Sequence, residues 1–394
     1  MTLEHGTPEP FRVAFPDADM DDMFRRLRDA RWADDVGNED WAFGVERGWL
    51  RDLVTYWTDE FDWRAQERSI NELPMFRVDI DGTPIHYVHV EGKGPDPTPL
   101  ILSHGWPWTF LDWRPVIGPL TDPAAYGGDP KDAFTVVVPS TPGFGFSTPL
   151  SGTGFGARKI ADHWVTLMRD VLGYDRFAAA GGDWGSTITG ELGHGYPQHV
   201  IGVWLTLPNI PGVKLWDITE DDFDDDERWM WERCLEARPT ITSHSTVHRV
   251  EPQTLAYGLV DSPLGTAAWL WGRRRDWSDH DGDVFEVFDR DFLCTKATIY
   301  WQTKTIGTAF RIYNEHYRGG GPPPPRTDAV PTITVPTGFG IFPHELLLIP
   351  RKVAAEYTNL HRWEVLEKGG HYPPSEQPEI TTRELRAFFG PLRD

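Results

Sequence analysis

Apolar and polar residues follow two different periods along the chain. From Phe11 to about Asn71, apolar residues recur every three or four positions, as in 20–27 and 49–57, which is the spacing of amphipathic helices. The period then changes to short β-rich runs at 76–80, 85–90 and 100–103. The sequence therefore predicts a helical N-terminal meander over residues 1–72, followed by a hairpin that leads into a buried strand.

Further along, β-rich runs alternate with helical ones, which is typical of a mostly parallel sheet with helices on both faces. The alternation stops after Pro208 and resumes near Thr332. We expect an α/β core over 73–208 and 326–394, with a helical lid inserted at 209–325. The expected strands of the alternating part are 134–138, 177–180, 200–207, 332–335 and 363–366, and the expected helices are 157–172, one after Asp183, 346–357 and 378–389.

Composition narrows the class of protein. A chain of 394 residues with 39% hydrophobic and 25% charged residues can bury a large core. Its net charge of −22 disfavours nucleic acid and acidic membranes as partners. Cys234 and Cys294 are too few for a disulfide framework, and the N-terminus has neither a basic flank nor an apolar run. These features predict a cytoplasmic protein, and its 19 Trp imply large apolar walls in a core or a ligand cleft.

The strongest chemical signal follows the expected strand 177–180. Gly181, Asp183 and Gly185 have the Gly-x-Nuc-x-Gly spacing of a nucleophile elbow, in which small residues allow a sharp turn that exposes the central side chain. The alternative is a glycine-rich turn in which Asp183 caps the following helix. The first interpretation makes a carboxylate the nucleophile.

A second signal, His104-Gly-Trp106-Pro, directly follows the expected strand 100–103. In α/β-hydrolases this loop supplies one backbone N–H of the oxyanion hole, and the residue after the nucleophile supplies the other. Trp106 and Trp184 are therefore the expected amide donors. We expect His104 to brace the loop, because it lies outside the order nucleophile, acid, histidine.

That order identifies candidates for the other two catalytic groups. His371, in Gly-Gly-His-Tyr after the last expected strand, fits the general base. Glu345 follows the strand before it and fits the acid that orients the histidine, with Asp328 as a rival that precedes the strand.

An aspartate nucleophile predicts a particular reaction. A carboxylate attacks an electrophilic sp³ carbon and leaves an alkyl ester on the protein, so the substrate must be an epoxide or an alkyl halide. Water activated by His371 would then hydrolyse the ester of Asp183. The chain has no Walker loop, zinc motif or complete dinucleotide fingerprint, so we expect neither a metal nor an organic cofactor.

Over nearly its whole length the sequence resembles the microsomal-type epoxide hydrolase family, in its soluble bacterial branch. Besides the residues above, the resemblance rests on the segments 61–64, 139–147 and 252–263. It implies an α/β-hydrolase core with a lid, hydrolysis of an epoxide to a vicinal diol, and a homodimer as a candidate assembly. It also implies lid tyrosines that donate to the epoxide oxygen, and Tyr313 matches one of them. His244 stands where the other is expected, and His248 or Tyr257 could serve instead.

Three alternatives for the function remain open at this point. The first is an epoxide hydrolase, with Trp108, Phe144 and Tyr257 as the expected substrate-binding residues, and its aromatic-rich lid favours a bulky or aromatic epoxide. The second is a haloalkane dehalogenase with the same aspartate, in which tryptophan N–H groups would hold the halide. The third is a ligand-binding homologue that has lost turnover.

Overall fold

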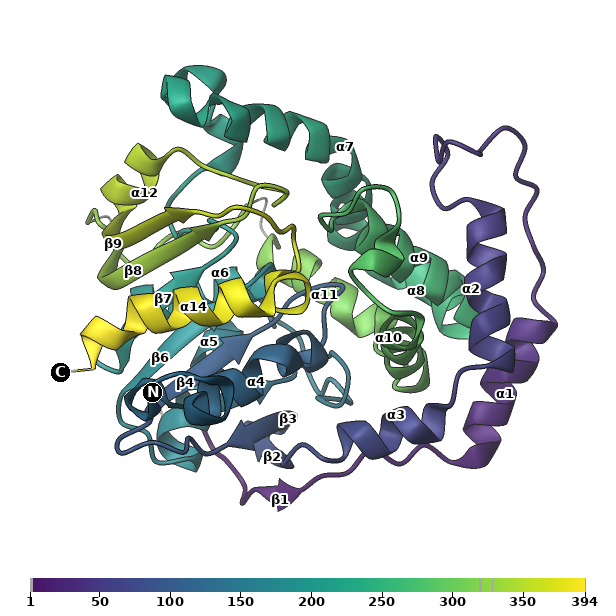
Figure 1. Ribbon diagram of the computed structural model, residues 1–394, viewed down its shortest axis with the longest axis horizontal. Coiled ribbons are helices and arrows are strands. Elements are labelled where there is room, and N and C mark those ends of the chain that lie inside the picture. Colours follow the sequence, from purple (N-terminus) through teal and green to yellow (C-terminus); the bar gives the residue numbers. More distant parts are fainter. Residues whose placement is uncertain (1–2, 319–320, 328, 394) are drawn as a thin grey trace.

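The computed structural model describes residues 3–318, 321–327 and 329–393, which contain one nine-stranded sheet (Figure 1). The strand pairs β5–β4, β4–β6, β6–β7, β7–β8 and β8–β9 are parallel, which confirms the expected mostly parallel sheet. Antiparallel strand pairing within the described residues is confined to β1–β2, β2–β3 and β3–β5. In spatial order the strands are β1 (Glu9–Pro10), β2 (Met75–Ile80), β3 (Thr83–Val90), β5 (Phe134–Pro139), β4 (Thr98–Ser103), β6 (Phe177–Gly181), β7 (Val200–Leu205), β8 (Ile333–Ile341) and β9 (Thr358–Val365).

Helices cover both faces of the sheet, as expected from the alternating pattern. On strand β7 a Cβ added at Gly202 would touch Phe388 of helix α14 (Pro378–Phe389), whereas the next residue, Val203, lies against Gly193 of α6 (Trp184–Gly195). Successive residues of a strand point to opposite faces, so α14 and α6 cover opposite sides. Helix α4 (Arg114–Thr121) packs beside α14, and α5 (Ala157–Val165), continued by a π-helical turn, packs beside α6.

In the part of the chain that the structure describes, five α-helices form the lid between β7 and β8. They are α7 (Arg228–Val250), α8 (Pro252–Asp261), α9 (Pro263–Asp276), α10 (Arg290–Gln302) and α11 (Ile306–His316). Figure 1 shows the N-terminal helices α1 (Asp17–Arg28) and α2 (Arg47–Asp59) beside α8, α9 and α10. Trp57 of α2 donates its indole N–H to Thr298 Oγ1 of α10 at 3.1 Å. The meander therefore fastens the lid from outside, and α3 (Trp63–Ile70) returns the chain to the sheet.

A buried ion cluster also joins the lid to the core. Asp112 follows β4 in the chain and is fully buried. Its carboxylate accepts hydrogen bonds from Arg274 of α9 at 2.9 Å and from Lys296 of α10. Both cations are themselves buried. Because each charge is out of water, the cluster is stable only while all three groups are present.

The structure differs from the sequence prediction at three places. β1 pairs with β2, so Glu9 and Pro10 add to the sheet although residues 1–72 were expected to be a helical region. β8 runs to Ile341 instead of ending near Val335, because pairing with β7 and β9 on both sides overrides the weak strand propensity of its proline and glycines. Residues 346–350 are irregular, and the expected helix is confined to α12 (Arg351–Tyr357).

The described helices include none that could span a bilayer, since each is too short or too polar. A last short helix, α13 (Pro373–Glu376), precedes α14, whose bounds match the expected 378–389.

Candidate active site

Asp183 lies at the tip of the turn between β6 and α6. Its backbone has φ 54° and ψ −129°, a strained conformation for a residue with a side chain, of the kind found at functional sites. A Cβ at Gly181 would collide with the carbonyl of Gly185, and a Cβ at Gly185 would collide with the carbonyl of Ser103. The Asp183 side chain makes no capping hydrogen bond to α6. This geometry is that of an elbow, and the capping alternative does not fit it.

His371 lies between two carboxylates. Its Nδ1 is 2.6 Å from Glu345 Oε1, and its Nε2 is 3.2 Å from Asp183 Oδ2. The Nε2 atom makes no well-aligned hydrogen bond to any described residue, and it is buried beside Asp183 Oδ2. Glu345 lies in the loop after β8 and is fully buried. Asp328, the rival acid, lies outside the described residues.

The charges around His371 determine its protonation state. Burial opposes protonation, but the carboxylates of Glu345 and Asp183 outweigh it and raise the pKa of His371 to about 10. The resting site therefore holds an imidazolium flanked by two carboxylates at neutral pH. Loss of either negative charge would lower the pKa of this histidine.

The loop after β4 faces the other oxygen of Asp183. Trp106 donates its backbone N–H to Asp183 Oδ1 at 2.7 Å. A Cβ at Gly105 would collide with the same Oδ1 and lie 2.5 Å from the backbone N of Trp184. Both expected amides therefore lie at one side of the carboxylate, where an oxyanion hole requires them.

His104 braces this loop, as expected. Its Nδ1–H donates to the carbonyl of Gly105 at 3.1 Å, and its Nε2 accepts the backbone N–H of Thr141 at 3.1 Å. Complete burial lowers the pKa of His104 to about 4, so the ring is neutral and one nitrogen donates while the other accepts. It does not face the reacting groups.

Tyr313 of α11 and His244 of α7 meet above the carboxylate. The Tyr313 hydroxyl is 3.2 Å from His244 Nε2, and His244 Nδ1 is 3.1 Å from the carbonyl of Thr240. Because a carbonyl only accepts, the proton of His244 lies on Nδ1, and burial lowers the pKa of His244 to about 3. Its Nε2 therefore accepts from Tyr313. The sequence expectation that His244 donates to the epoxide oxygen does not fit this pattern.

The expected substrate-binding residues lie outside the cavity wall. Trp108 is buried behind the site, with its ring 5.9 Å from that of His371, and Phe144 packs against His104. Tyr257 is 73% exposed on α8, away from the reacting groups. His248, an alternative donor to the epoxide oxygen in the sequence analysis, accepts the indole N–H of Trp269 at 3.1 Å. These positions do not support a substrate-binding role for Trp108, Phe144 or Tyr257.

A cavity opens above Asp183, between core and lid. Its catalytic end contains Asp183, His371, Tyr313 and His244, and its remaining walls are largely apolar. Sequence reasoning missed Leu215, Trp216, Ile241, Trp277, Leu347 and Arg249 among these walls. Their only signal was the aromatic-rich lid, because periodicity does not reveal which lid residues face inward.

Comparisons with known proteins identify the family. The model described as Epoxide hydrolase N terminus matches residues 8–113, and the alpha/beta hydrolase fold model matches residues 98–247. A Stigmatella aurantiaca protein with a provisional epoxide hydrolase name is 35% identical, over 98% of this chain and 85% of that protein. Epoxide hydrolase 1 of Sus scrofa is 31% identical, over 99% of this chain and 90% of its own length. The chain belongs to the epoxide hydrolase family.

The structural comparison agrees with this assignment. The Aspergillus niger epoxide hydrolase structure superposes with a TM-score of 0.84 at 27% identity and covers 98% of this chain and 97% of its own. The resemblance to microsomal-type epoxide hydrolases drawn from the sequence is therefore confirmed, as is the activity class, a hydrolase that acts on the ether bond of epoxides. The elbow, the buried histidine and the lid tyrosine are thus found in a chain whose family opens epoxides.

Proposed function

We propose that this epoxide hydrolase forms an alkyl ester on Asp183 and hydrolyses it with water activated by His371. The observation that carries the proposal is the alignment of Asp183, His371 and Glu345, joined by separations of 3.2 and 2.6 Å. Oδ1 is held by the Trp106 amide, which leaves Oδ2 as the attacking oxygen. Oδ2 is also the oxygen nearest His371.

In the first step Asp183 Oδ2 bonds to an epoxide carbon, and the carbon–oxygen bond of the ring breaks. When substrate binds, the hydroxyl of Tyr313 turns its hydrogen from His244 Nε2 to the ring oxygen, donates a hydrogen bond to it and then transfers the proton. Burial holds the pKa of Tyr313 well above its usual value, so a lasting phenolate is disfavoured and the hydroxyl must be reprotonated. The proton that restores the Tyr313 hydroxyl comes from the imidazolium of His371. The pKa of His371 falls at this stage, because the negative charge of Asp183 is lost in the ester.

In the second step neutral His371 takes a proton from water, and the oxygen of that water attacks Cγ of the Asp183 ester. The tetrahedral oxyanion forms on Oδ1, beside the amides of Trp106 and Trp184. When this intermediate collapses, the bond between Cγ and the substrate oxygen breaks, and that oxygen takes the second proton of the attacking water. The diol then leaves, the carboxylate of Asp183 is restored, and the first proton remains on His371. The cycle therefore starts and ends with His371 as the imidazolium and Asp183 as the carboxylate.

The dehalogenase alternative finds no support, because the relatives are named as epoxide hydrolases and the cavity holds a hydroxyl donor that halide departure does not need. A bulky or aromatic epoxide remains the proposed substrate, supported by the apolar cavity walls. A cytoplasmic location and a homodimer remain predictions from the sequence.

Single-turnover kinetics with styrene oxide test the mechanism. Wild type should release diol, Asp183→Asn should neither alkylate nor release diol, and His371→Gln should accumulate a covalent ester detectable as a mass increase of the intact protein. Loss of the base should slow ester hydrolysis by about 10²–10⁴-fold. Diol formation by Asp183→Asn at the wild-type rate would refute the nucleophile, and absence of turnover by wild type would favour the ligand-binding alternative.

A further inference from the structure

A buried carboxylate that the proposed reaction does not use belongs to Glu376. This residue ends the short helix α13 and is 9% exposed. Its Oε2 accepts the backbone N–H of Gly370 at 2.9 Å, and its Oε1 accepts the backbone N–H of Tyr372 at 2.7 Å. These two residues lie on either side of His371. The carboxylate therefore holds the backbone of the catalytic loop at two points that flank the base.

The same carboxylate binds the segment that follows lid helix α9. Its Oε2 also accepts the backbone N–H of Asp279 at 2.8 Å. Asp279 Oδ2 in turn accepts the N–H of Gly369 at 2.7 Å, and the Trp277 carbonyl accepts the N–H of His371 at 2.8 Å. All four consecutive amides of the loop 369–372 are thereby hydrogen-bonded, two of them to the one carboxylate.

The loop packs directly against these partners. A Cβ added at Gly370 would lie 2.6 Å from the Trp277 carbonyl oxygen and 3.0 Å from Glu376 Oε2, so only glycine allows the backbone to come so close. Each of the three hydrogen bonds of Glu376 goes to a backbone amide. Its effect on the imidazole of His371 is therefore exerted through the backbone.

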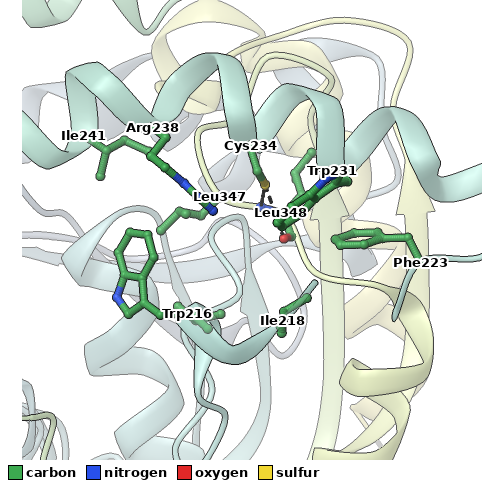
Figure 2. A pocket seen from close by; sticks show the side chains of 10 residues that line it. Trp216, Ile218, Phe223, Trp231, Cys234, Arg238, Ile241, Leu347 and Leu348 are labelled. Atoms are coloured by element: carbon green, nitrogen blue, oxygen red, sulfur yellow. Dashed lines mark hydrogen bonds between the residues drawn. The ribbon is translucent and has the colours of Figure 1, made fainter. Parts of the chain in front are cut away.

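The acid partner of the base is held from a different direction. Figure 2 shows Cys234 of α7 next to Leu348, whose backbone N–H it accepts at 3.1 Å. Arg233 of the same helix donates to the carbonyl of Glu345 at 3.1 Å. Because α7 fixes the acid and Glu376 fixes the loop of the base, loss of the Glu376 contacts would displace the imidazole relative to an acid that stays in place.

We propose that Glu376 is a positioning residue that holds the backbone on both sides of His371 and so keeps its imidazole between the two catalytic carboxylates. The inference rests on the proposed function, since it takes His371 as the base that activates water. The imidazole lies 2.6 and 3.2 Å from those carboxylates, and a misplacement of about 1 Å in such an array can slow a step by about 10²-fold. Glu376 therefore controls the step that needs the base.

Single-turnover kinetics of Glu376→Gln with styrene oxide test this role. The side-chain NH₂ of glutamine replaces one acceptor oxygen and faces a backbone N–H with which it cannot bond. We expect ester hydrolysis to slow by about 10²-fold while alkylation of Asp183 keeps its wild-type rate, so that the ester accumulates. His371→Gln, measured in parallel, gives the hydrolysis rate without the base.

The pKa of His371 provides a readout that needs no turnover. In wild type the two carboxylates raise the pKa of His371 to about 10. Displacement of the ring weakens both attractions, so in Glu376→Gln the ring should titrate below its wild-type pKa, as followed by nuclear magnetic resonance. Glu376→Asp separates charge from position, because it keeps the charge but withdraws the carboxylate by one methylene. It should show the same selective slowing of hydrolysis.

Glu384→Gln is the matched control. Glu384 is also buried, but it lies on α14 and its carboxylate pairs with Arg362 and Arg383 instead of with amides of the catalytic loop. This variant should lower the melting temperature and leave the ratio of the alkylation and hydrolysis rates unchanged. A general loss of stability is thereby distinguished from a loss of position.

The outcomes decide the proposal in either direction. Slower ester hydrolysis at an unchanged alkylation rate, together with a lowered pKa of His371, supports it. Equal slowing of both steps, wild-type hydrolysis in Glu376→Gln or Glu376→Asp, or the same selectivity in Glu384→Gln overturns it. If Glu376→Gln does not fold, Glu376→Asp decides the question. Failure of wild type to form an ester would contradict the proposed function, whereas the titration of His371 would still decide whether Glu376 holds the imidazole.

Discussion

The charge of Asp183 should control the protonation of His371, and removing that charge tests the proposed timing of the two chemical steps. The perturbation is Asp183→Asn, which keeps the shape of the side chain and resembles the ester in being neutral. In wild type the two neighbouring carboxylates raise the pKa of His371 to about 10. The variant leaves Glu345 as the remaining close carboxylate.

The magnitude follows from the distance between the two groups. Opposite unit charges at the Nε2–Oδ2 separation of 3.2 Å attract by ~5 kcal/mol at an effective dielectric constant of about 20. This equals almost four pKa units at about 1.4 kcal/mol per unit. We therefore expect the pKa of His371 to fall to about 6 in Asp183→Asn and in the ester intermediate. A base with that pKa is suited to activating water at neutral pH.

Nuclear magnetic resonance of the imidazole provides the assay. The ring signals of His371, assigned with the His371→Gln variant, are followed against pH in wild type and in Asp183→Asn. The hydrolysis rate of the wild-type ester, measured by single-turnover quenching, should rise with an apparent pKa near the value in the variant. If His371 in Asp183→Asn still titrates near 10, the charge of Asp183 does not hold the proton and the proposed timing is refuted.

The same shift predicts how stability depends on pH. The folded pKa of His371 lies above its ordinary value of 6.5, so its stabilising contribution is complete below pH 6.5 and is lost as pH rises through 10. Within that window the wild-type free energy of unfolding should fall by about 1.4 kcal/mol per pH unit relative to Asp183→Asn. Urea unfolding of both proteins at several pH values measures the difference. If the free energy of unfolding depends on pH in the same way in both proteins, the raised pKa of His371 is contradicted.

Three other changes have expected outcomes. Asp112→Asn removes the anion of the buried cluster and leaves two buried cations, so urea unfolding should show a loss of about 3–5 kcal/mol. Gly185→Ala should lower the melting temperature and abolish alkylation because its Cβ meets the β4 backbone, whereas Gly258→Ala, with open space around it on α8, should be neutral or stabilising. Tyr313→Phe should slow alkylation by about 10²–10⁴-fold while ester hydrolysis proceeds at nearly the wild-type rate, and equal alkylation rates would exclude its role as donor.

Much of the core could be predicted from the sequence because local and tertiary preferences agree there. The run 177–180 is apolar, the elbow glycines follow it, and α14 occupies the expected 378–389. Strand β8 could not be delimited, since Pro336 and its glycines are poor strand formers held in place by neighbours on both sides. β1 was missed because a two-residue strand has no periodicity of its own.

The candidate site divides in a similar way. Asp183, Glu345 and His371 follow strands at the same end of a parallel sheet, so their spacing along the chain was enough to predict that they meet. The role of His244 was not predictable, because it depends on which nitrogen faces the Thr240 carbonyl. The substrate-binding residues were mispredicted for a related reason, since an aromatic residue in a conspicuous motif, such as Trp108, can pack behind a catalytic loop as readily as in front of it.

The position of the lid and the orientation of the catalytic histidine are linked through the backbone. Arg233 of α7 donates to the Glu345 carbonyl at 3.1 Å, and the backbone N–H of His371 donates to the carbonyl of Trp277, just after α9, at 2.8 Å. Lid residues thus bind directly to the loops that carry the acid and the base. A lid that opened as a rigid body would have to break both contacts and disturb the His371–Glu345 pair.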